Sequence, residues 1–183
     1  GLGARGERGA GARRLVVGGG GRVHGRGPGE NEREKPGSPR PFPSPYDTPM
    51  DDPALAGDIH AFWFGAAAPD PRWFRKDPAF DAEIRTRYGA AIEAALAGAY
   101  EAWSATPRGA LARILLLDQF TRNMFRGTAR AFATDPLALA LAQAAVAAGA
   151  DQALPPTQRA FLYLPYMHSE SRVIHEVALT LFA

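Results

Sequence analysis

The sequence predicts an all-α fold, in which a disordered tail over residues 1–49 precedes one domain of stacked antiparallel helices over residues 50–183. Apolar residues in the second part recur at helical spacing, and no window shows the sustained two-residue alternation of a half-buried strand. Proline follows Asp or Thr at several points, as is typical of helix starts. The tail is rich in Gly, Arg and Pro and has few apolar side chains to offset the entropy of ordering.

Charge and composition separate the tail from the domain. Residues 1–49 carry nine Lys and Arg against five Asp and Glu, whereas the remainder carries 12 against 14. The domain is therefore slightly acidic, and we expect it to bind no nucleic acid. Its longest apolar run, residues 136–142, is shorter than the roughly 20 residues of a membrane span, so we expect no membrane partner. The absence of cysteine excludes disulfides and fits a cytoplasmic protein.

The first three helices are predicted from apolar spacing and start signals. The stripe of the first is made of Leu55, Ile59, Phe62 and Trp63. Asp77, which a proline follows, is a predicted N-cap and begins a second helix whose apolar face extends over residues 80–95. Thr106 begins a third helix in the same way, and Gly127 is the expected stop. His60, on the first helix, carries no signal of its own.

Three more helices complete the domain. The fourth begins after Asp135, ends near Gly149 and is apolar on all sides, so we expect it to lie between other helices. The fifth follows Pro156 and is interrupted by Pro165. A sixth helix is expected to begin at Ser169 or nearby, and its apolar face is Val173, Ile174, Val177, Ala178, Leu181 and Phe182. Six helices with short connections imply stacked antiparallel pairs.

A polar cluster lies in the third helix, next to its most aliphatic part. Asp118, Arg122 and Arg126 fall in one narrow arc at about 100° per residue, and Gln119 and Asn123 flank that arc. One interpretation is that the helix leaves the core here. Asp118 and Arg122 would then face water as a pair that contributes only about 0.3 to 0.5 kcal/mol.

The other interpretation is a binding site. Leu111 and Leu115 share the arc one and two turns earlier, so the arc begins in the core and meets a facing helix. Asp118 would hold Arg122 in place. The planar guanidinium groups of Arg122 and Arg126, with the amide side chains beside them, have the chemistry of an anion site.

A second group of polar residues follows the kinked fifth helix. His168 lies at a helix junction, where it can act as an acid, a base or a hydrogen-bond donor. In the alternative, Ser169 caps the sixth helix, Glu170 sits favourably in its first turn and His168 is an ordinary partly buried residue. His168 and Glu170 lack a third ligand at useful spacing, so we expect no metal, and no cofactor motif is present.

Five segments, in order, resemble the domain of unknown function 924 family. They are residues 62–65 (Phe-Trp-Phe-Gly), 115–123, 125–128, 131–136 and 163–170. The resemblance spans about residues 53–183 and implies an all-helical fold similar to tetratricopeptide-repeat superhelices, although no 34-residue repeat is visible. The family's name assigns no activity.

The chain departs from the family at its end. Family members continue past the Leu-Phe pair that closes the sixth helix, so the resemblance implies that this chain is truncated at its C-terminus. An apolar face on the last helix would then be uncovered, which favours self-association.

The sequence leaves three functions open. The first is binding of a small anionic ligand or an acidic peptide in a polar groove, with Arg122 and Arg126 on the anion, Asp118 orienting Arg122, and hydrogen bonds from side chains that include His168. The groove residues are Asp118, Gln119, Arg122, Asn123, Arg126 and His168. The alternative is a hydrolase with His168 as general base, oriented by Glu170 or Asp118. A third is a structural protein-interaction module.

Overall fold

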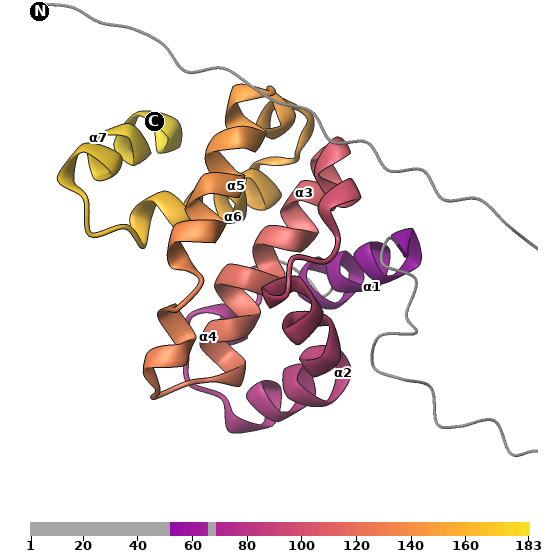
Figure 1. Ribbon diagram of the computed structural model, residues 1–183. Coiled ribbons are helices and arrows are strands. Elements are labelled where there is room, and N and C mark those ends of the chain that lie inside the picture. The colour runs from indigo at the N-terminus through magenta and orange to yellow at the C-terminus, as the bar shows by residue number, and fades with distance from the viewer. Residues whose placement is uncertain (1–51, 66–68) are drawn as a thin grey trace, which may run out of the picture. The chain divides into compact units, whose positions relative to one another are not determined.

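The computed structural model describes residues 52–65 and 69–183, which form helices throughout (Figure 1). They are α1 (Pro53–Phe64), α2 (Pro78–Leu96), α3 (Pro107–Ile114), α4 (Thr121–Met124), α5 (Asp135–Ala147), α6 (Pro156–Met167) and α7 (Arg172–Phe182). The described residues contain no strand, which confirms the all-α class. Within them, no helix is both long and apolar enough to cross a membrane. The disordered tail predicted for residues 1–49 lies outside this part of the chain.

Local capping begins α2 and α3 where the sequence predicts. The Asp77 carboxylate accepts hydrogen bonds from two backbone N–H groups of the first turn, each at 3.1 Å. The Thr106 hydroxyl accepts one from the Gly109 N–H, also at 3.1 Å. In both helices proline occupies the first position, where the missing N–H has no intrahelical partner in any case. Both helix starts are therefore properties of the local sequence.

The predicted third helix contains an irregularity that spacing does not reveal. This predicted helix is a rod made of α3 and α4 with a π-helical segment, Leu115–Phe120, between them. A π turn disturbs the regular backbone hydrogen bonds, and two hydroxyls compensate: Thr121 and Thr134 donate to the Leu117 carbonyl at 2.8 and 2.6 Å. Gly127, the expected stop, follows α4 with a φ of 81°.

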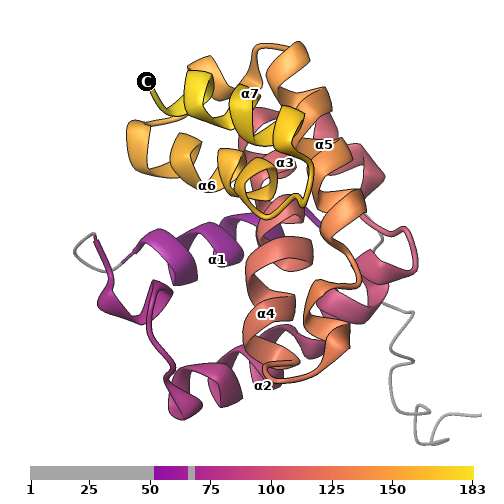
Figure 2. The same cartoon turned by 90° about the vertical axis from the view of Figure 1, so that its left-hand side faces the viewer.

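The α3–α4 rod is the centre around which the domain packs. Helices α1, α2, α5 and α6 all contact it, and in Figures 1 and 2 it lies among them. Aromatic rings fill the space between α1, the rod and α6: the ring centroids of Trp63 and Phe120 are 5.2 Å apart, and those of Trp63 and Phe161 are 5.7 Å apart. The large side chains buried completely or almost so are Trp63, Tyr88, Phe120, Ile59, Ile84, Ile92, Leu111, Ile114, Leu115, Leu116, Leu117 and Leu162.

Helix α5 corrects one prediction. Its sequence is apolar on all sides, but only Ala138, Ala142 and Ala145 are buried, and Leu137 is exposed. The prediction that this helix lies between others is wrong. Its three buried alanines form one face, and Leu139, Leu141 and Val146 are partly buried against the core.

Two helix boundaries near the C-terminus also differ from prediction. Pro165 does not interrupt the fifth helix, because α6 continues through it to Met167. Proline removes one backbone N–H, but Pro165 is buried within α6 and the helix is not broken there. The sixth helix begins after Ser171, close to the expected start at Ser169 or nearby, but its cap is Ser171 and not Ser169. The Ser169 hydroxyl instead accepts a hydrogen bond from the Ser171 N–H at 3.1 Å.

Helix α7 packs on α6 with a small part of its apolar face. Only Ala178 is buried, and Val173, Val177, Leu179 and Phe182 are exposed. Self-association through this face and truncation of the chain both stay predictions.

Candidate functional site

Asp118, in the π-helical segment, is a fully buried carboxylate with three side-chain neighbours. One oxygen lies 2.7 Å from Nδ1 of His168 and 3.5 Å from a terminal nitrogen of Arg122. The other oxygen accepts from the Gln119 amide at 2.5 Å. A buried charge is tolerated when it is paired and hydrogen-bonded in this way. The interpretation that Asp118 and Arg122 form a solvated pair is therefore wrong for Asp118.

His168, which follows the last turn of α6, is held by this carboxylate. A carboxylate accepts hydrogen bonds, so Nδ1 carries a proton. Whenever the ring is neutral, Nε2 therefore holds the free lone pair. The side chain is 26% exposed, and no described residue is hydrogen-bonded to Nε2. Asp118 and His168, 50 residues apart in the sequence, thus form a dyad whose second nitrogen is available.

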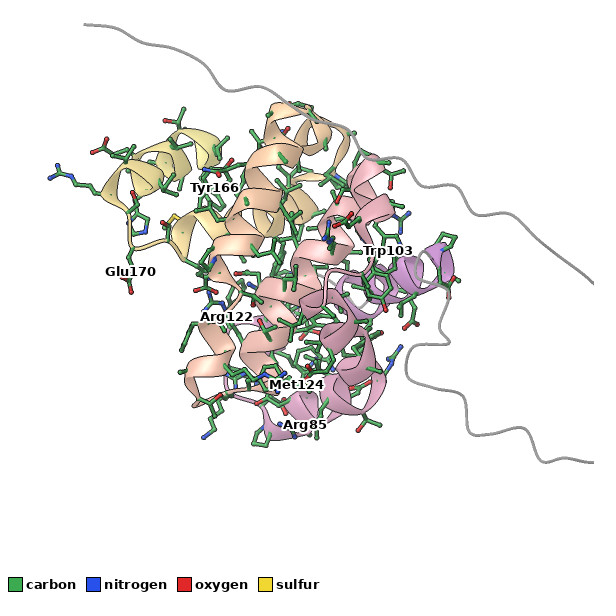
Figure 3. All side chains as sticks on the ribbon, in the orientation of Figure 1. Arg85, Trp103, Arg122, Met124, Tyr166 and Glu170 are labelled. Atoms are coloured by element: carbon green, nitrogen blue, oxygen red, sulfur yellow. The ribbon has the colours of Figure 1, made fainter. Side chains whose placement is uncertain are left out.

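A pocket of about 410 Å³ adjoins the histidine of this dyad. We call it the dyad pocket, and it is lined by Phe132, Asp135, Pro136, Leu139, His168, Ser169 and Glu170. These residues come from the start of α5, the segment before it and the turn between α6 and α7, from which Glu170 projects in Figure 3. Two carboxylates, those of Asp135 and Glu170, therefore face the space beside His168.

Arg122 lies behind the wall of the dyad pocket. One terminal nitrogen donates to Asp135 at 2.8 Å and is also within ion-pair distance of Asp118. The guanidinium carbon is 5.1 Å from the centre of the Phe132 ring, and the buried Nε has no partner among the described residues. Arg122 thus joins the buried carboxylate of the rod to the one at the start of α5.

Arg126, one turn further on, belongs to a different network. It donates two hydrogen bonds to Asp81 on α2, at 2.6 and 2.8 Å, and a third to Asn123 at 2.7 Å. The bonds to Asp81 raise the pKa of Arg126 above its ordinary value. Asn123 in turn donates to the Gln119 carbonyl at 2.9 Å, and neither Asn123 nor Arg126 lines the dyad pocket.

Comparison with known proteins assigns the domain to a family. The family described as "Bacterial protein of unknown function (DUF924)" matches residues 59–183. The chain belongs to this family. A similar solved structure is that of the protein of unknown function ATU0120 from Agrobacterium tumefaciens, with a TM-score of 0.66 and 45% sequence identity over 70% of this chain and 72% of that one. No curated protein matches the chain. The likeness to tetratricopeptide repeats stays a prediction.

In this DUF924 domain the structure brings together only part of the predicted site. Asp118, Gln119, Arg122 and His168 are in contact, while Arg126 pairs with α2. Glu170 lines the pocket but has no hydrogen bond to His168. Among the described residues, no group of three His, Cys, Asp or Glu side chains is arranged to hold a metal ion.

Among the residues of the dyad pocket that the sequence does not identify, Asp135 and Phe132 are the two that contact Arg122. The sequence predicts Asp135 only as a helix start, and it assigns no role to Phe132, which belongs to one of the family segments. In the structure the Asp135 carboxylate binds Arg122, and the Phe132 ring lies beside the guanidinium of Arg122. The Asp-Pro pair is explained by the helix start alone, so the sequence gives no reason to expect that the Asp135 side chain also binds an arginine. No local signal in the sequence identifies the partner of Arg122, which lies 13 residues away.

Proposed function

We propose that this domain is an enzyme of the hydrolase type in which His168 is the general base. One observation carries the proposal: Nδ1 of His168 lies 2.7 Å from a fully buried carboxylate, in a ring that lines a pocket. The carboxylate fixes the tautomer and the orientation of the ring, so that the lone pair of Nε2 is the group left to accept a proton.

The chemistry follows from this tautomer. Nε2 takes a proton from a water molecule as that water attacks the substrate, and the ring becomes an imidazolium. The Asp118 carboxylate stabilises that positive charge without taking the proton itself. Nε2 then gives the proton to the leaving group, so that the histidine returns to its first state. Gln119 and Arg122 hold Asp118 in position through their contacts with its two oxygens.

The π-helical segment gives independent support. π-Helical turns are rare and occur frequently at functional sites. Here the turn contains Asp118, the residue that orients His168. The Leu117 carbonyl next to it receives two hydroxyl donors, Thr121 and Thr134, which keep the irregular turn in a defined geometry.

The charges favour a neutral or cationic substrate. Asp135 and Glu170 line the dyad pocket, whereas Arg122 is already paired with two carboxylates. An anion in the pocket would meet these negative charges first. Arg126 is paired with Asp81 and Asn123 and does not line the pocket. Binding of an anionic ligand or an acidic peptide therefore has less support. It stays an untested prediction, as does a role as a protein-interaction module.

Hydrolysis of a matched panel of substrates tests the proposal. Chromogenic esters and amides with neutral, cationic and anionic side groups are incubated with the wild type, His168→Gln and His175→Gln, in which the replaced histidine is exposed on α7. We expect the wild type to favour neutral or cationic substrates and His168→Gln to be about 100-fold slower, because general-base catalysis contributes that much. Equal rates for the wild type and His168→Gln contradict the assignment.

A second measurement does not depend on finding a substrate. Ring-nitrogen NMR of His168 near neutral pH reports which nitrogen carries the proton. We expect a protonated Nδ1, and a change of tautomer or of chemical shift in Asp118→Asn. A neutral ring protonated on Nε2 would mean that His168 cannot act as proposed.

A further inference from the structure

The two carboxylates that line the dyad pocket differ in what they already bind. Asp135 accepts a hydrogen bond from Arg122 at 2.8 Å, so a cation inside the protein already compensates its charge. Glu170 lies in the turn between α6 and α7 and is exposed. Its side chain has no hydrogen bond or ion pair with any residue that the structure describes. Glu170 is therefore the carboxylate of this pocket that can still bind a ligand.

The charges around the dyad pocket do not cancel. Asp118 and Asp135 share the single positive charge of Arg122. Glu170 adds a further negative charge, and the nearest Lys or Arg in the sequence, Arg172, pairs with Glu176 and does not line the pocket. The pocket therefore has an excess of negative charge, which attracts a cation and repels an anion.

The rest of the lining includes an apolar surface. It is made of Phe132, Pro136 and Leu139. Phe132 is 57% exposed, although aromatic side chains gain most of their stabilisation from burial. The volume of about 410 Å³ is within the usual range of roughly 300–1,000 Å³ for small-molecule sites, which combine an apolar lining with a few polar groups. The pocket thus offers an apolar contact surface beside an unpaired carboxylate.

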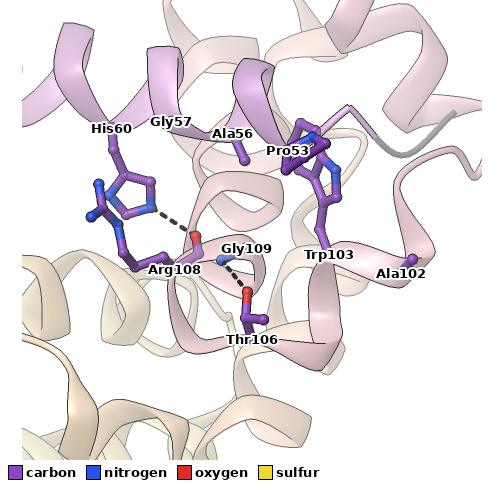
Figure 4. A pocket seen from close by; sticks show the side chains of 9 residues that line it. All are labelled: Pro53, Ala56, Gly57, His60, Ala102, Trp103, Thr106, Arg108 and Gly109. Carbon is purple, nitrogen blue, oxygen red and sulfur yellow. Dashed lines mark hydrogen bonds between the residues drawn. The ribbon is translucent and has the colours of Figure 1, made fainter. Parts of the chain in front are cut away.

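A pocket of about 470 Å³ between α1 and the start of α3 provides a comparison (Figure 4). It also contains a histidine, His60, whose Nε2 donates to the Arg108 carbonyl oxygen at 2.7 Å. None of the residues that line it is Asp or Glu, and Arg108 is one of them. A cation has no carboxylate partner there. The excess of negative charge therefore distinguishes the dyad pocket from a cavity of similar size in the same domain.

We infer that Glu170 determines the specificity of the dyad pocket, and that its substrate carries an ammonium or guanidinium group on an apolar body. The cationic group pairs with the Glu170 carboxylate, and the apolar body packs on Phe132 and Leu139, with the bond to be hydrolysed next to Nε2 of His168. The inference rests on the hydrolase function proposed above and narrows its substrate class from neutral or cationic to cationic. The binding step itself can be measured without any turnover.

Matched probes test the charge requirement. Benzylammonium and benzyl alcohol have the same apolar body and differ in charge. Each is titrated into the full chain at low salt, and NMR follows the ring nitrogens of His168 and His60. We expect benzylammonium to shift His168 and to bind about fivefold more tightly than the alcohol, as an exposed ion pair allows. In about 1 M salt this preference should disappear, because the charges are screened. Equal affinities at low salt, no shift at His168, or shifts at His60 in its place would overturn the inference.

Two matched variants identify the carboxylate. Glu170→Gln keeps the shape of the side chain and removes its charge, so the two probes should bind this variant equally. Glu176→Gln removes an exposed carboxylate of α7 that does not line the pocket, and it should keep the wild-type preference. A preference for benzylammonium that survives in Glu170→Gln would overturn the role of this residue. The titrations of the wild type stand even if a variant fails to fold.

Turnover separates this inference from the reaction on which it rests. With a cationic ester, Glu170→Gln should raise KM about fivefold and change kcat little, as loss of a binding contact does. His168→Gln should lower kcat instead. If no substrate is hydrolysed but the probe preference depends on Glu170, the reaction is wrong and the cation site stands. If hydrolysis depends on His168 but neutral and cationic esters have equal KM values, the reaction stands and this inference is wrong.

Discussion

Two histidines of the domain, His60 and His168, have the same first contact and opposite consequences. In each, one ring nitrogen lies 2.7 Å from an oxygen atom. His60 donates to a backbone carbonyl and is almost fully buried. His168 donates to the carboxylate of Asp118, and its side chain remains partly exposed. In the sequence, only the position of His168 at a helix junction distinguishes the two.

The partner of the first nitrogen decides what the second nitrogen can do. A carboxylate stabilises the imidazolium that forms when the ring takes a proton, so His168 suits proton transfer. A carbonyl in a buried site gives no such charge compensation, and burial disfavours the charged ring. His60 therefore suits the role of a fixed neutral acceptor. Four perturbations can break or sharpen this contrast.

The largest effect is expected from Asp118→Ala. It removes the acceptor that His168, Gln119 and Arg122 share inside the protein, so buried donors lose their partner. The free energy of unfolding should fall by about 3 kcal/mol, as for other broken buried pairs. Urea denaturation at neutral pH measures this. Asp135→Ala, at a partly exposed carboxylate, is the control and should cost less; equal losses would mean that burial of Asp118 is not decisive.

The pH dependence of the free energy of unfolding should show that His60 resists protonation in the folded protein. The folded state holds the pKa of His60 below its ordinary value of 6.5, mainly through burial. Below pH 6.5 the unfolded chain therefore takes up a proton that the folded protein does not. The stabilisation is present above pH 6.5 and is lost as the pH falls towards the lowered pKa.

Replacement of His60 measures that contribution. Chemical denaturation from pH 7.5 to pH 5 should give a shallower pH dependence for His60→Gln than for the wild type. Gly57→Ala, which changes no titratable group, should keep the wild-type slope. Identical slopes for all three proteins would show that His60 does not resist protonation.

A smaller effect is expected at the arginine outside the dyad pocket. Arg126→Ala removes the contact with Asp81, but the arginine is partly exposed and solvent screens the pair. We expect a loss of about 1 kcal/mol in the free energy of unfolding and no change in the pH dependence of the His168 ring signals. A change in those signals would show that the two arginine networks act as one.

The smallest effect should come from Gly57→Ala on α1. The added methyl group meets open space, and alanine is the better helix former, so the free energy of unfolding should rise by about 0.5 to 1 kcal/mol. Thermal denaturation measures the gain. A loss of stability would show that the added methyl group does not meet open space at this position.

The sequence by itself determined what depends on neighbours along the chain. Asp77 and Thr106 begin their helices because each side chain bonds N–H groups two or three residues away. Helical spacing determined the all-α class, and Leu111 and Leu115 showed that the arc of Asp118 begins in the core. These signals act within one or two turns, so they need no knowledge of the packed protein.

Only the tertiary structure decided which polar groups meet. Spacing places Arg122 and Arg126 on one arc. Packing pairs Arg122 with Asp135 and Arg126 with Asp81. It also brings His168 to Asp118 across 50 residues and makes room for the π-helical turn. Helical periodicity tells which way a side chain faces. What it faces depends on helices distant in the sequence, whose positions are determined by burial of the whole core.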